Sequence, residues 1–341
     1  MELETLQILW YLVLGAAVMM YTVLDGFDLG VGVLHLFART DQERRIFLNA
    51  IGPVWDGNEV WLIIIGGALF AGFPTAFGIV FSAFYTPTMV FLSGIIFRAV
   101  AIEFRSKHPG RKWRLGWDLV FSLASIVIAC GAGILLACLM RGIPLNEEGV
   151  FIGGVSDFVS FYSVLVGLMT IALFALHGLC FLLMKTEDSL YNFLRSLVKP
   201  VVLIFAVLYC VTTIDTIVHL PHMIERFQSS PILYLIPLST FLALVNIPYQ
   251  IHRNREGMAF IFSSLSIALL FVLFGVGMFP VIVRSSIDPA FHVTLYNSSS
   301  MATTLKVILI TALVGIPLVL AYGIFLYRIF RGKVKIDASS Y

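Results

Sequence analysis

Residues 120–140 read VFSLASIVIACGAGILLACLM and contain no charged side chain. A helix needs about 20 consecutive apolar residues to cross the roughly 30 Å of hydrocarbon in a bilayer, and residues 258–283 form a second uncharged run of sufficient length. Across the 341 residues, 59% of side chains are hydrophobic and only 12% are charged, whereas soluble domains carry about 25% charged residues. An alternating barrel pattern is absent, so the sequence predicts an all-α membrane protein and excludes a soluble globule.

Hydropathy, charged residues and Pro/Gly breaks divide the chain into about nine transmembrane helices that form a polytopic bundle. The predicted spans cover residues 7–36, 50–73, 76–103, 117–140, 159–184, 199–220, 231–251, 258–283 and 303–328. We expect no separate soluble domain, because the longest loops cover only residues 141–158 and 284–302. The sequence therefore predicts a single membrane-embedded helical domain over residues 1–335 and a short disordered C-terminal tail over 336–341.

The distribution of Lys and Arg between alternate loops predicts the orientation. With these spans, 17 basic residues fall on the side that holds the C-terminus, and only four fall on the opposite side, namely Arg141, Arg226, Arg284 and Lys306. Cytoplasmic loops carry an excess of Lys and Arg. We therefore expect the N-terminus outside and the C-terminus in the cytoplasm.

Ionisable side chains within spans are costly in a bilayer, so their positions are informative. Each of the first two spans carries, near its cytoplasmic end, two acids three residues apart, a spacing that places both on one helix face. The third span ends on the same side with an arginine and a fifth acid. These residues are Asp25, Asp28, Asp56, Glu59, Arg98 and Glu103.

Two interpretations of these acids remain open on residue chemistry alone. Carboxylates that lie close together and partly removed from water can exchange protons near neutral pH, which favours a proton entry route. In the alternative, Arg98 and one carboxylate form a structural ion pair while the other acids cap helices or face interfacial water. Asp56 lies three residues before Glu59, which is the spacing of a capping box.

The histidines do not predict a haem or metal site. Such a site needs His, Met or Cys ligands on facing helices, and these histidines do not pair at helical spacings across neighbouring spans. His177, inside the fifth span, is noted as a candidate metal ligand, although a lone membrane histidine is more often hydrogen-bonded within the core. His219 and His222 flank Pro221 at the outer end of the sixth span, with Asp215 one turn before His219.

Several motifs in a fixed order give the sequence a specific resemblance. They are Asp25-Gly-Phe-Asp28-Leu-Gly-Val-Gly32, Glu43-Arg-Arg45, Gly52-Pro-Val-Trp-Asp56-Gly-Asn-Glu-Val-Trp61-Leu, Phe97-Arg98, Glu103-Phe-Arg105, His177-Gly178, Lys185-Thr-Glu187, Ser286-Ile-Asp288-Pro-Ala290 and Ser298-Ser-Ser300. Their order and spacing resemble subunit II of the cytochrome bd-type quinol oxidase family. The resemblance covers essentially the whole chain and is strongest over residues 20–105.

The resemblance implies a role in respiratory electron transport. In this family a partner, subunit I, holds the b-type and d-type haems, and the complex oxidises quinol, reduces dioxygen to water and takes its chemical protons from inside. The resemblance thus implies that this chain is not catalytic alone, binds no haem tightly by itself, and lies in the inner membrane of a bacterial or archaeal cell.

The resemblance also implies roles for individual residues. Asp56 matches the family position at the subunit II end of a cytoplasmic proton route, whereas Glu59 stands where some members have an amide. Some members bind a structural quinone in this subunit, and Trp55 and Trp61 are the candidate contacts here. The predicted proton pathway comprises Asp56, Asp25, Asp28, Glu59 and Glu103, with Arg98 as the orienting charge.

Two other functions fit some of the same features. A secondary transporter also carries acids within its spans, but it would ordinarily have broken helices near mid-membrane, whereas these acids gather at one surface. A passive scaffold that only stabilises subunit I would need no titratable side chain. Co-purification with a haem-bearing subunit would favour the oxidase, and uptake into vesicles by this chain alone would favour the transporter.

Overall fold

The computed structural model describes residues 2–336. The helices of the chain are α1 (Leu3–Leu34), α2 (Asp41–Ile51), α3 (Trp55–Gly72), α4 (Pro74–Ala83), α5 (Tyr85–Phe104), α6 (Arg111–Arg141), α7 (Phe161–Lys185), α8 (Asp188–His219), α9 (His222–Ser229), α10 (Leu235–His252), α11 (Glu256–Met278) and α12 (Ala302–Ile329). Between them lie the 3-10 helices η1 (His35–Phe37), η2 (Arg105–Lys107), η3 (Val155–Phe158), η4 (Pro231–Tyr234) and η5 (Pro289–Phe291), and two antiparallel strands, β1 (Val281–Val283) and β2 (Val293–Thr294). Apart from Ile336, the predicted disordered tail (336–341) lies outside the described residues.

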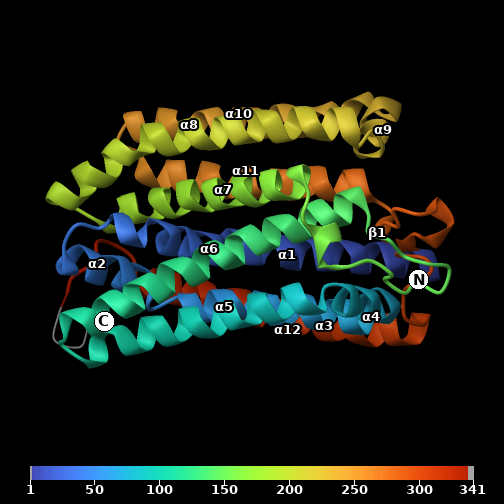
Figure 1. The fold of residues 1–341 in the computed structure, drawn as a ribbon, viewed down its shortest axis with the longest axis horizontal. Helices are drawn as coiled ribbons and strands as arrows, with labels where there is room; N and C mark the ends of the chain where they lie inside the picture. Colours follow the sequence, from blue (N-terminus) through green and yellow to red (C-terminus); the bar gives the residue numbers. More distant parts are fainter. Residues whose placement is uncertain (1, 337–341) are drawn as a thin grey trace.

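The long helices run side by side, and the two chain ends lie at opposite ends of the bundle, here called the N end and the C end (Figure 1). Within residues 2–336, eight helices are long and apolar enough to cross a membrane, and a ninth crossing results if the bent pair α2 and α3 counts as one. The chain is therefore a multi-pass membrane protein, and the prediction of about nine spans is confirmed. The 49° bend follows Gly52 and Pro53, because a proline has no backbone N–H to continue the helix.

Three predicted spans differ clearly from the observed helices. The predicted span 199–220 begins too late, because α8 starts at Asp188. The predicted span 76–103 is divided at Phe84 into the short helix α4 and the crossing helix α5. Pro87 cannot donate to the carbonyl of Ala83, the last residue of α4, so the helix breaks there. The predicted span 258–283 is too long, because α11 ends at Met278 before Pro280 and the following residues form β1.

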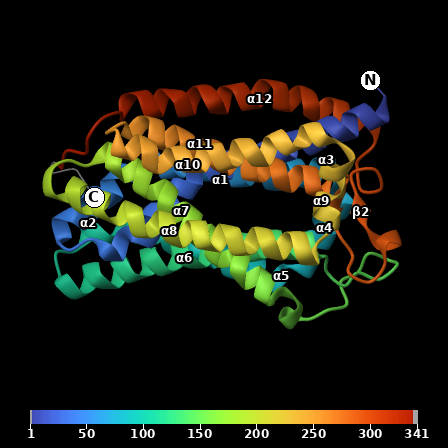
Figure 2. The same cartoon turned by 90° about the horizontal axis from the view of Figure 1, so that it is seen from above.

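The bundle is layered around α1 and α7 (Figures 1 and 2). Helix α1 packs against α3, α6, α7, α11 and α12, and α7 packs against α1, α6, α8 and α11. Helices α8 and α10 form one outer layer, and α3, α5 and α12 lie on the opposite side. Helix α7 is mostly buried, whereas Leu305 is the only buried residue of α12.

Glycines allow α1 and α7 to cross at close range. A Cβ atom added to Gly30 would lie 1.8 Å from the carbonyl oxygen of Phe174, and one added to Gly178 would lie 2.5 Å from the carbonyl carbon of Gly30. Gly26 faces the ring of Phe174, and Gly32 faces Ser125 of α6. The glycine face of residues 25–32 thus allows close packing of α1 against both α7 and α6.

Gly30→Ala is expected to destabilise the fold by about 1–3 kcal/mol or more, because backbone atoms cannot move aside as a side chain would. Thermal unfolding of the purified protein measures the effect. Gly15→Ala, on the same helix, is the matched control, since an added Cβ there has no heavy atom within 4 Å. Equal unfolding midpoints for the two variants would contradict the close crossing of α1 and α7.

Loops cover the N end, where β1 and β2 pair. The backbone N–H of Ser285 donates to Nδ1 of His292 (3.2 Å), and Nη1 of Arg284, which follows β1, lies 3.1 Å from Nε2 of the same ring. Burial, reinforced by the positive charge of Arg284, lowers the pKa of His292 below its ordinary value. The ring therefore favours its neutral form, which leaves a nitrogen free to accept a hydrogen bond.

Candidate functional site

A buried arginine joins three helices near the C end. The guanidinium of Arg98 (α5) lies 2.7 Å from the carboxylate of Asp25 (α1) and 3.4 Å from that of Glu59 (α3). Arg98 and Asp25 are buried, and the side chain of Glu59 is 17% exposed. We call Asp25, Asp28, Glu59 and Arg98 the Arg98 cluster.

The fourth member, Asp28, is held by an amide that the sequence analysis overlooked. Asn58 (α3) donates to the carboxylate of Asp28 (2.7 Å) and to the carbonyl of Leu24 (3.2 Å). Its own carbonyl accepts a hydrogen bond from the hydroxyl of Tyr327 (α12) at 2.8 Å. Asn58 therefore connects α1, α3 and α12 at one buried point.

The Arg98 cluster contains more acid than base. Three carboxylates and one guanidinium would carry a net charge of −2 if all were ionised, and buried unbalanced charge is costly. One oxygen of Asp28 is buried without a hydrogen bond among the described residues. A site of this composition favours bound protons, and its carboxylates can pass them on when an acceptor is near.

Asp56 lies outside the cluster, at the surface. It occupies the first turn of α3 and is exposed, and among the described residues its carboxylate has no hydrogen bond or ion pair. The capping interpretation is wrong, because α3 begins at Trp55 with Val54 as its N-cap and no side chain bonds there. Glu59, one turn further along α3, is the carboxylate between this surface and Arg98.

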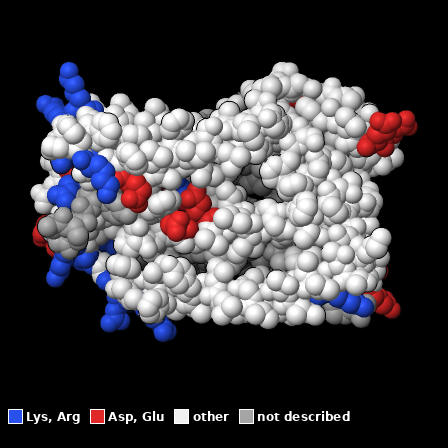
Figure 3. Space-filling view, turned by 90° about the horizontal axis from the view of Figure 1, so that it is seen from below, with Lys and Arg blue, Asp and Glu red and all other residues white. Residues whose placement is uncertain are grey.

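The face that carries α3, α5 and α12 is otherwise poor in charge. Seen from this side, basic side chains gather at the C end, and acidic side chains interrupt an uncharged surface between the ends (Figure 3). The exposed residues of α12 include Val314, Leu318 and Phe325, which are all apolar. An uncharged surface with a few acids is the pattern of a membrane-embedded face that needs a covering for those acids.

The other predicted site residues lie further from Arg98. Glu103 is partly exposed and lies five residues beyond Arg98 on α5, which is about 7.5 Å along the helix axis. Trp61 is buried in a core with Ala17 and Tyr21, whereas Trp55 is partly exposed. A quinone contact at either tryptophan stays a prediction.

A second buried charge cluster lies closer to the C end, around Asp118 of α6. Its carboxylate accepts hydrogen bonds from Nε2 of His35 (2.6 Å), from Arg44 (2.9 Å) and from Nε of Arg105 (2.5 Å). We call this group the Asp118 cluster. Asp41, which is 46% exposed, extends it by pairing with Arg105 and Arg114.

The Asp118 cluster connects α6 to three other segments at the C end. His35 follows α1, Arg44 belongs to α2, and Arg105 follows α5. Asp118 was not among the predicted site residues, although it is the only acid in α6. A single acid within an otherwise apolar span was the signal that could have found it.

His177 is a structural residue of the core. Its Nε2 lies 2.9 Å from the carbonyl oxygen of Val23 and its Nδ1 lies 2.7 Å from the hydroxyl of Ser263. The ring also stacks on Phe260, with centroids 4.8 Å apart. Both nitrogens are thus engaged, so this residue does not fit a haem or metal ligand, and within residues 2–336 no three His, Cys, Asp or Glu side chains are grouped to hold a metal ion.

Comparison with known proteins identifies the family. The model of the family described as "Cytochrome bd terminal oxidase subunit II" matches residues 6–330. The chain belongs to this family. The resemblance predicted from the ordered motifs is therefore confirmed, and the match covers nearly the whole chain, as predicted.

Individual members of the cytochrome bd subunit II family are similar over nearly their whole length. The chain is 32% identical to the cytochrome bd ubiquinol oxidase subunit 2 of Bacillus subtilis (strain 168), covering 98% of each chain. It is 29% identical to the cytochrome bd-I ubiquinol oxidase subunit 2 of Escherichia coli (strain K12), covering 98% of this chain and 96% of that one. A chain of the bd oxidase from Geobacillus thermodenitrificans has the same fold, with a TM-score of 0.80 at 20% identity over 96% of this chain and 98% of that chain.

Proposed function

We propose that this chain is subunit II of a membrane-bound quinol:oxygen oxidoreductase, in which it supports a haem-bearing subunit I and contributes to proton uptake. Membership of the cytochrome bd subunit II family and the names of the relatives, which are ubiquinol oxidase subunits, support this assignment. The complex oxidises quinol and reduces dioxygen to water. This chain is not the catalytic subunit by itself.

The b-type and d-type haems belong to the partner subunit. Haem iron needs a free axial ligand, and the ring nitrogens of His177, the candidate within the bundle, are both hydrogen-bonded. The haems supply the electron transfer and oxygen chemistry, while this chain supplies packing and titratable side chains. A structural quinone beside Trp55 is part of the proposal, because that indole is partly exposed at the start of α3.

The partner subunit covers the face formed by α3, α5 and α12. The observation that supports this placement is the exposure of Asp56 within a membrane-crossing helix. A carboxylate that faces lipid costs about 2.5–3.5 kcal/mol at the bilayer centre and less toward the end of a span, where Asp56 lies. A protein partner with polar groups or water at the interface removes that cost. The apolar surface of α12 provides the rest of the contact.

The C end faces the cytoplasm in this proposal, which places the chain in the inner membrane of a bacterial or archaeal cell with its N-terminus outside. Basic residues gather at the C end (Figure 3), as expected for cytoplasmic loops. Asp56, in the first turn of α3, then lies at the cytoplasmic side. Protons enter at Asp56 and pass to Glu59. The carboxylates of the Arg98 cluster share these protons, which then reach the face that contacts the partner subunit.

The single observation that carries the proton route is the sequence of carboxylates from the surface inward. Asp56 is exposed, Glu59 is partly exposed, and Asp25 is buried, with Arg98 contacting the latter two. Arg98 keeps its two partner carboxylates close together and limits how strongly they hold protons. Glu103, also on α5 and partly exposed, provides a second point of contact with water.

Asp56→Asn tests this route in the purified complex. The amide keeps the shape of the side chain but cannot release a proton, so quinol oxidase turnover is expected to fall at least about tenfold, since a positioned proton-transfer group typically contributes 10²–10⁴-fold. Haem content and subunit composition are expected to stay unchanged. Asp56→Glu is expected to restore most of the turnover, and the charge-separating phase after oxygen binding should slow only in the amide variant.

The matched control is Asp157→Asn, an exposed acid at the opposite end of the bundle, which is expected to leave turnover unchanged. Full turnover in an assembled Asp56→Asn complex would contradict the proton route and would mean that this subunit acts only as a scaffold. Failure of the wild-type chain to co-purify with a haem-bearing subunit would contradict the complex itself.

A further inference from the structure

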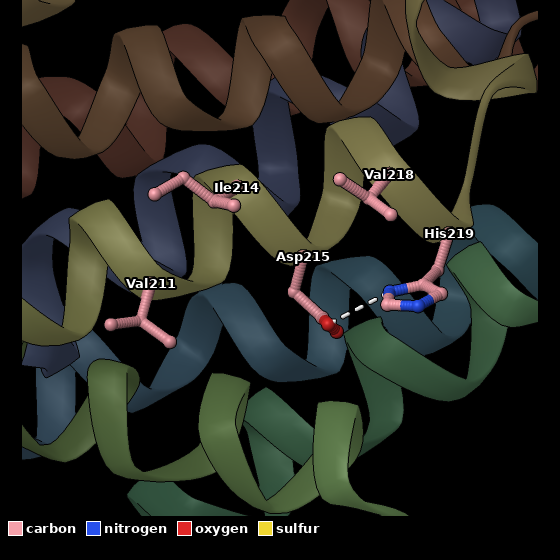
Figure 4. Close-up of a pocket in the computed structure, with 5 residues that line it drawn as sticks. All are labelled: Val211, Ile214, Asp215, Val218 and His219. Carbon is pink, nitrogen blue, oxygen red and sulfur yellow. Dashed lines mark hydrogen bonds and ion pairs between the residues drawn. The ribbon is translucent and has the colours of Figure 1, made fainter.

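A shallow cavity, largely open to the outside, lies on the outer side of α8, close to the N end. One part, of about 320 Å³, is lined by Arg141 at the end of α6, by Ser160, Phe161 and Tyr162 at the start of α7, and by Asp215 and His219. A second part, of about 170 Å³, shares Asp215 and His219 and continues past Val218, Ile214 and Val211 (Figure 4). We call the first part, around Arg141 and Asp215, the polar head of the cavity, and the second part, along Val211 and Ile214, its apolar extension.

The polar head contains a cation without a partner. Among the described residues, the guanidinium of Arg141 has no ion pair or hydrogen bond, although Arg141 is only partly exposed. Phe161 and Tyr162, which begin α7, line the same part of the cavity, and the positive end of a helix adds to the attraction for an anion. A phosphate fits this side of the cavity.

The opposite wall of the head is acidic. One oxygen of the Asp215 carboxylate accepts a hydrogen bond from Nδ1 of His219 (2.9 Å), as Figure 4 shows. Its other oxygen has no hydrogen bond among residues 2–336. Asp215 is 15% exposed and lies one turn before His219, the last residue of α8. An ammonium group fits this side.

The apolar extension runs along α8 toward the middle of the bundle. Val211 and Ile214 lie one turn or less before Asp215 and are exposed, and Leu203 and Val207 continue the same apolar face. Helix α8 lies in the layer opposite to α3 and α5 (Figure 1), so the subunit that covers those helices does not cover this cavity. The surrounding membrane is the source of its occupant.

We propose that this cavity binds a phospholipid with a primary-ammonium head group, such as phosphatidylethanolamine. The lipid phosphate pairs with Arg141, its ammonium group donates to Asp215, and one acyl chain lies along Val211 and Ile214. A lipid with a purely anionic head group places no cation at Asp215. A choline head group has no N–H to donate to the carboxylate, so it also fits less well.

Native mass spectrometry of the complete complex tests the proposal. The complex is purified in detergent and re-equilibrated with phosphatidylethanolamine, phosphatidylglycerol or phosphatidylcholine of identical acyl chains. One phosphatidylethanolamine is expected to remain bound at collision energies that remove the other two lipids. Inorganic phosphate, added alone at millimolar concentration, is expected not to displace it.

Variants separate the two contacts. Arg141→Gln and Asp215→Asn are each expected to weaken retention of phosphatidylethanolamine about tenfold or more, because each removes one charge-assisted hydrogen bond. Arg141→Lys keeps the charge and is expected to retain the lipid. Glu225→Gln, an exposed acid at the same end that does not line the cavity, is the matched control and should bind as the wild type does.

Three results would overturn the proposal. The first is equal retention of the three lipids, and the second is preferential retention of phosphatidylglycerol that survives Asp215→Asn, which would assign an anionic lipid instead. The third is phosphatidylethanolamine binding that neither variant weakens. Turnover of the complex does not enter the test, so its outcome is independent of the proton route.

Discussion

Arg98→Met is expected to destabilise the chain by about 3–5 kcal/mol, because it leaves buried carboxylates without their counter-charge. Arg98 is 1% exposed and contacts both Asp25 and Glu59. Replacing it removes the only cation of the Arg98 cluster. The expected result is a sharp fall in the amount of folded protein in the membrane, and a lower unfolding midpoint for the fraction that is purified.

Two further variants test whether the loss of the counter-charge causes this destabilisation. Arg111→Met, at an exposed arginine in the first turn of α6, is the matched control and should stay near the wild-type midpoint. The triple variant Arg98→Met, Asp25→Asn and Glu59→Gln removes charge from both sides and is expected to recover much of the stability, since neutral replacement of a buried ion pair is often tolerated. If Arg98→Met alone unfolds like the wild type, the ion pairs do not stabilise the bundle.

Asp118→Ala is also expected to destabilise the chain by about 3–5 kcal/mol, because it leaves buried cations without their counter-charge. It removes the buried carboxylate that accepts from His35, Arg44 and Arg105. Arg105 is 1% exposed and would keep only Asp41. Increased proteolysis of the loops at the C end, together with a lower unfolding midpoint, measures the loss.

Asp41→Ala is the control within the same cluster. Asp41 also pairs with two arginines, but its side chain is 46% exposed, and exposed ion pairs contribute about 0–1 kcal/mol. The comparison therefore separates burial from the number of partners. Equal effects of the two substitutions would mean that burial of Asp118 does not determine its contribution.

The sequence predicted the membrane class, about nine spans and the gathering of acids at one end, because these depend on hydropathy and on residue spacing along single helices. It did not predict that Asp56 is exposed whereas Glu59 contacts Arg98. Three residues on a helix turn the side-chain direction by about 60° net, which leaves Asp56 on the surface and brings Glu59 to Arg98. Which of the two carboxylates meets Arg98 depends on the position of α5, which carries Arg98.

Neutral residues were harder to predict than charged ones. Asn58 lies within a motif quoted for its acids, and its partner Tyr327 is 269 positions away in the sequence. Nothing local indicates that α12 returns to α3, so this hydrogen bond required the packed structure. The boundary errors at Ala83 and Met278 are different, because Pro87 and Pro280 were visible signals of where those helices end.

The exposure of α12 has a consequence for biogenesis. Of the helices within residues 2–336, α12 leaves the ribosome last, and its apolar side chains match lipid as well as they match a protein. The newly inserted chain can therefore complete its own bundle, with Tyr327 bonded to Asn58, and remain in the bilayer until the other subunit is made. In the proposed complex, assembly requires no refolding of this chain, and its driving force includes the removal of Asp56 from lipid.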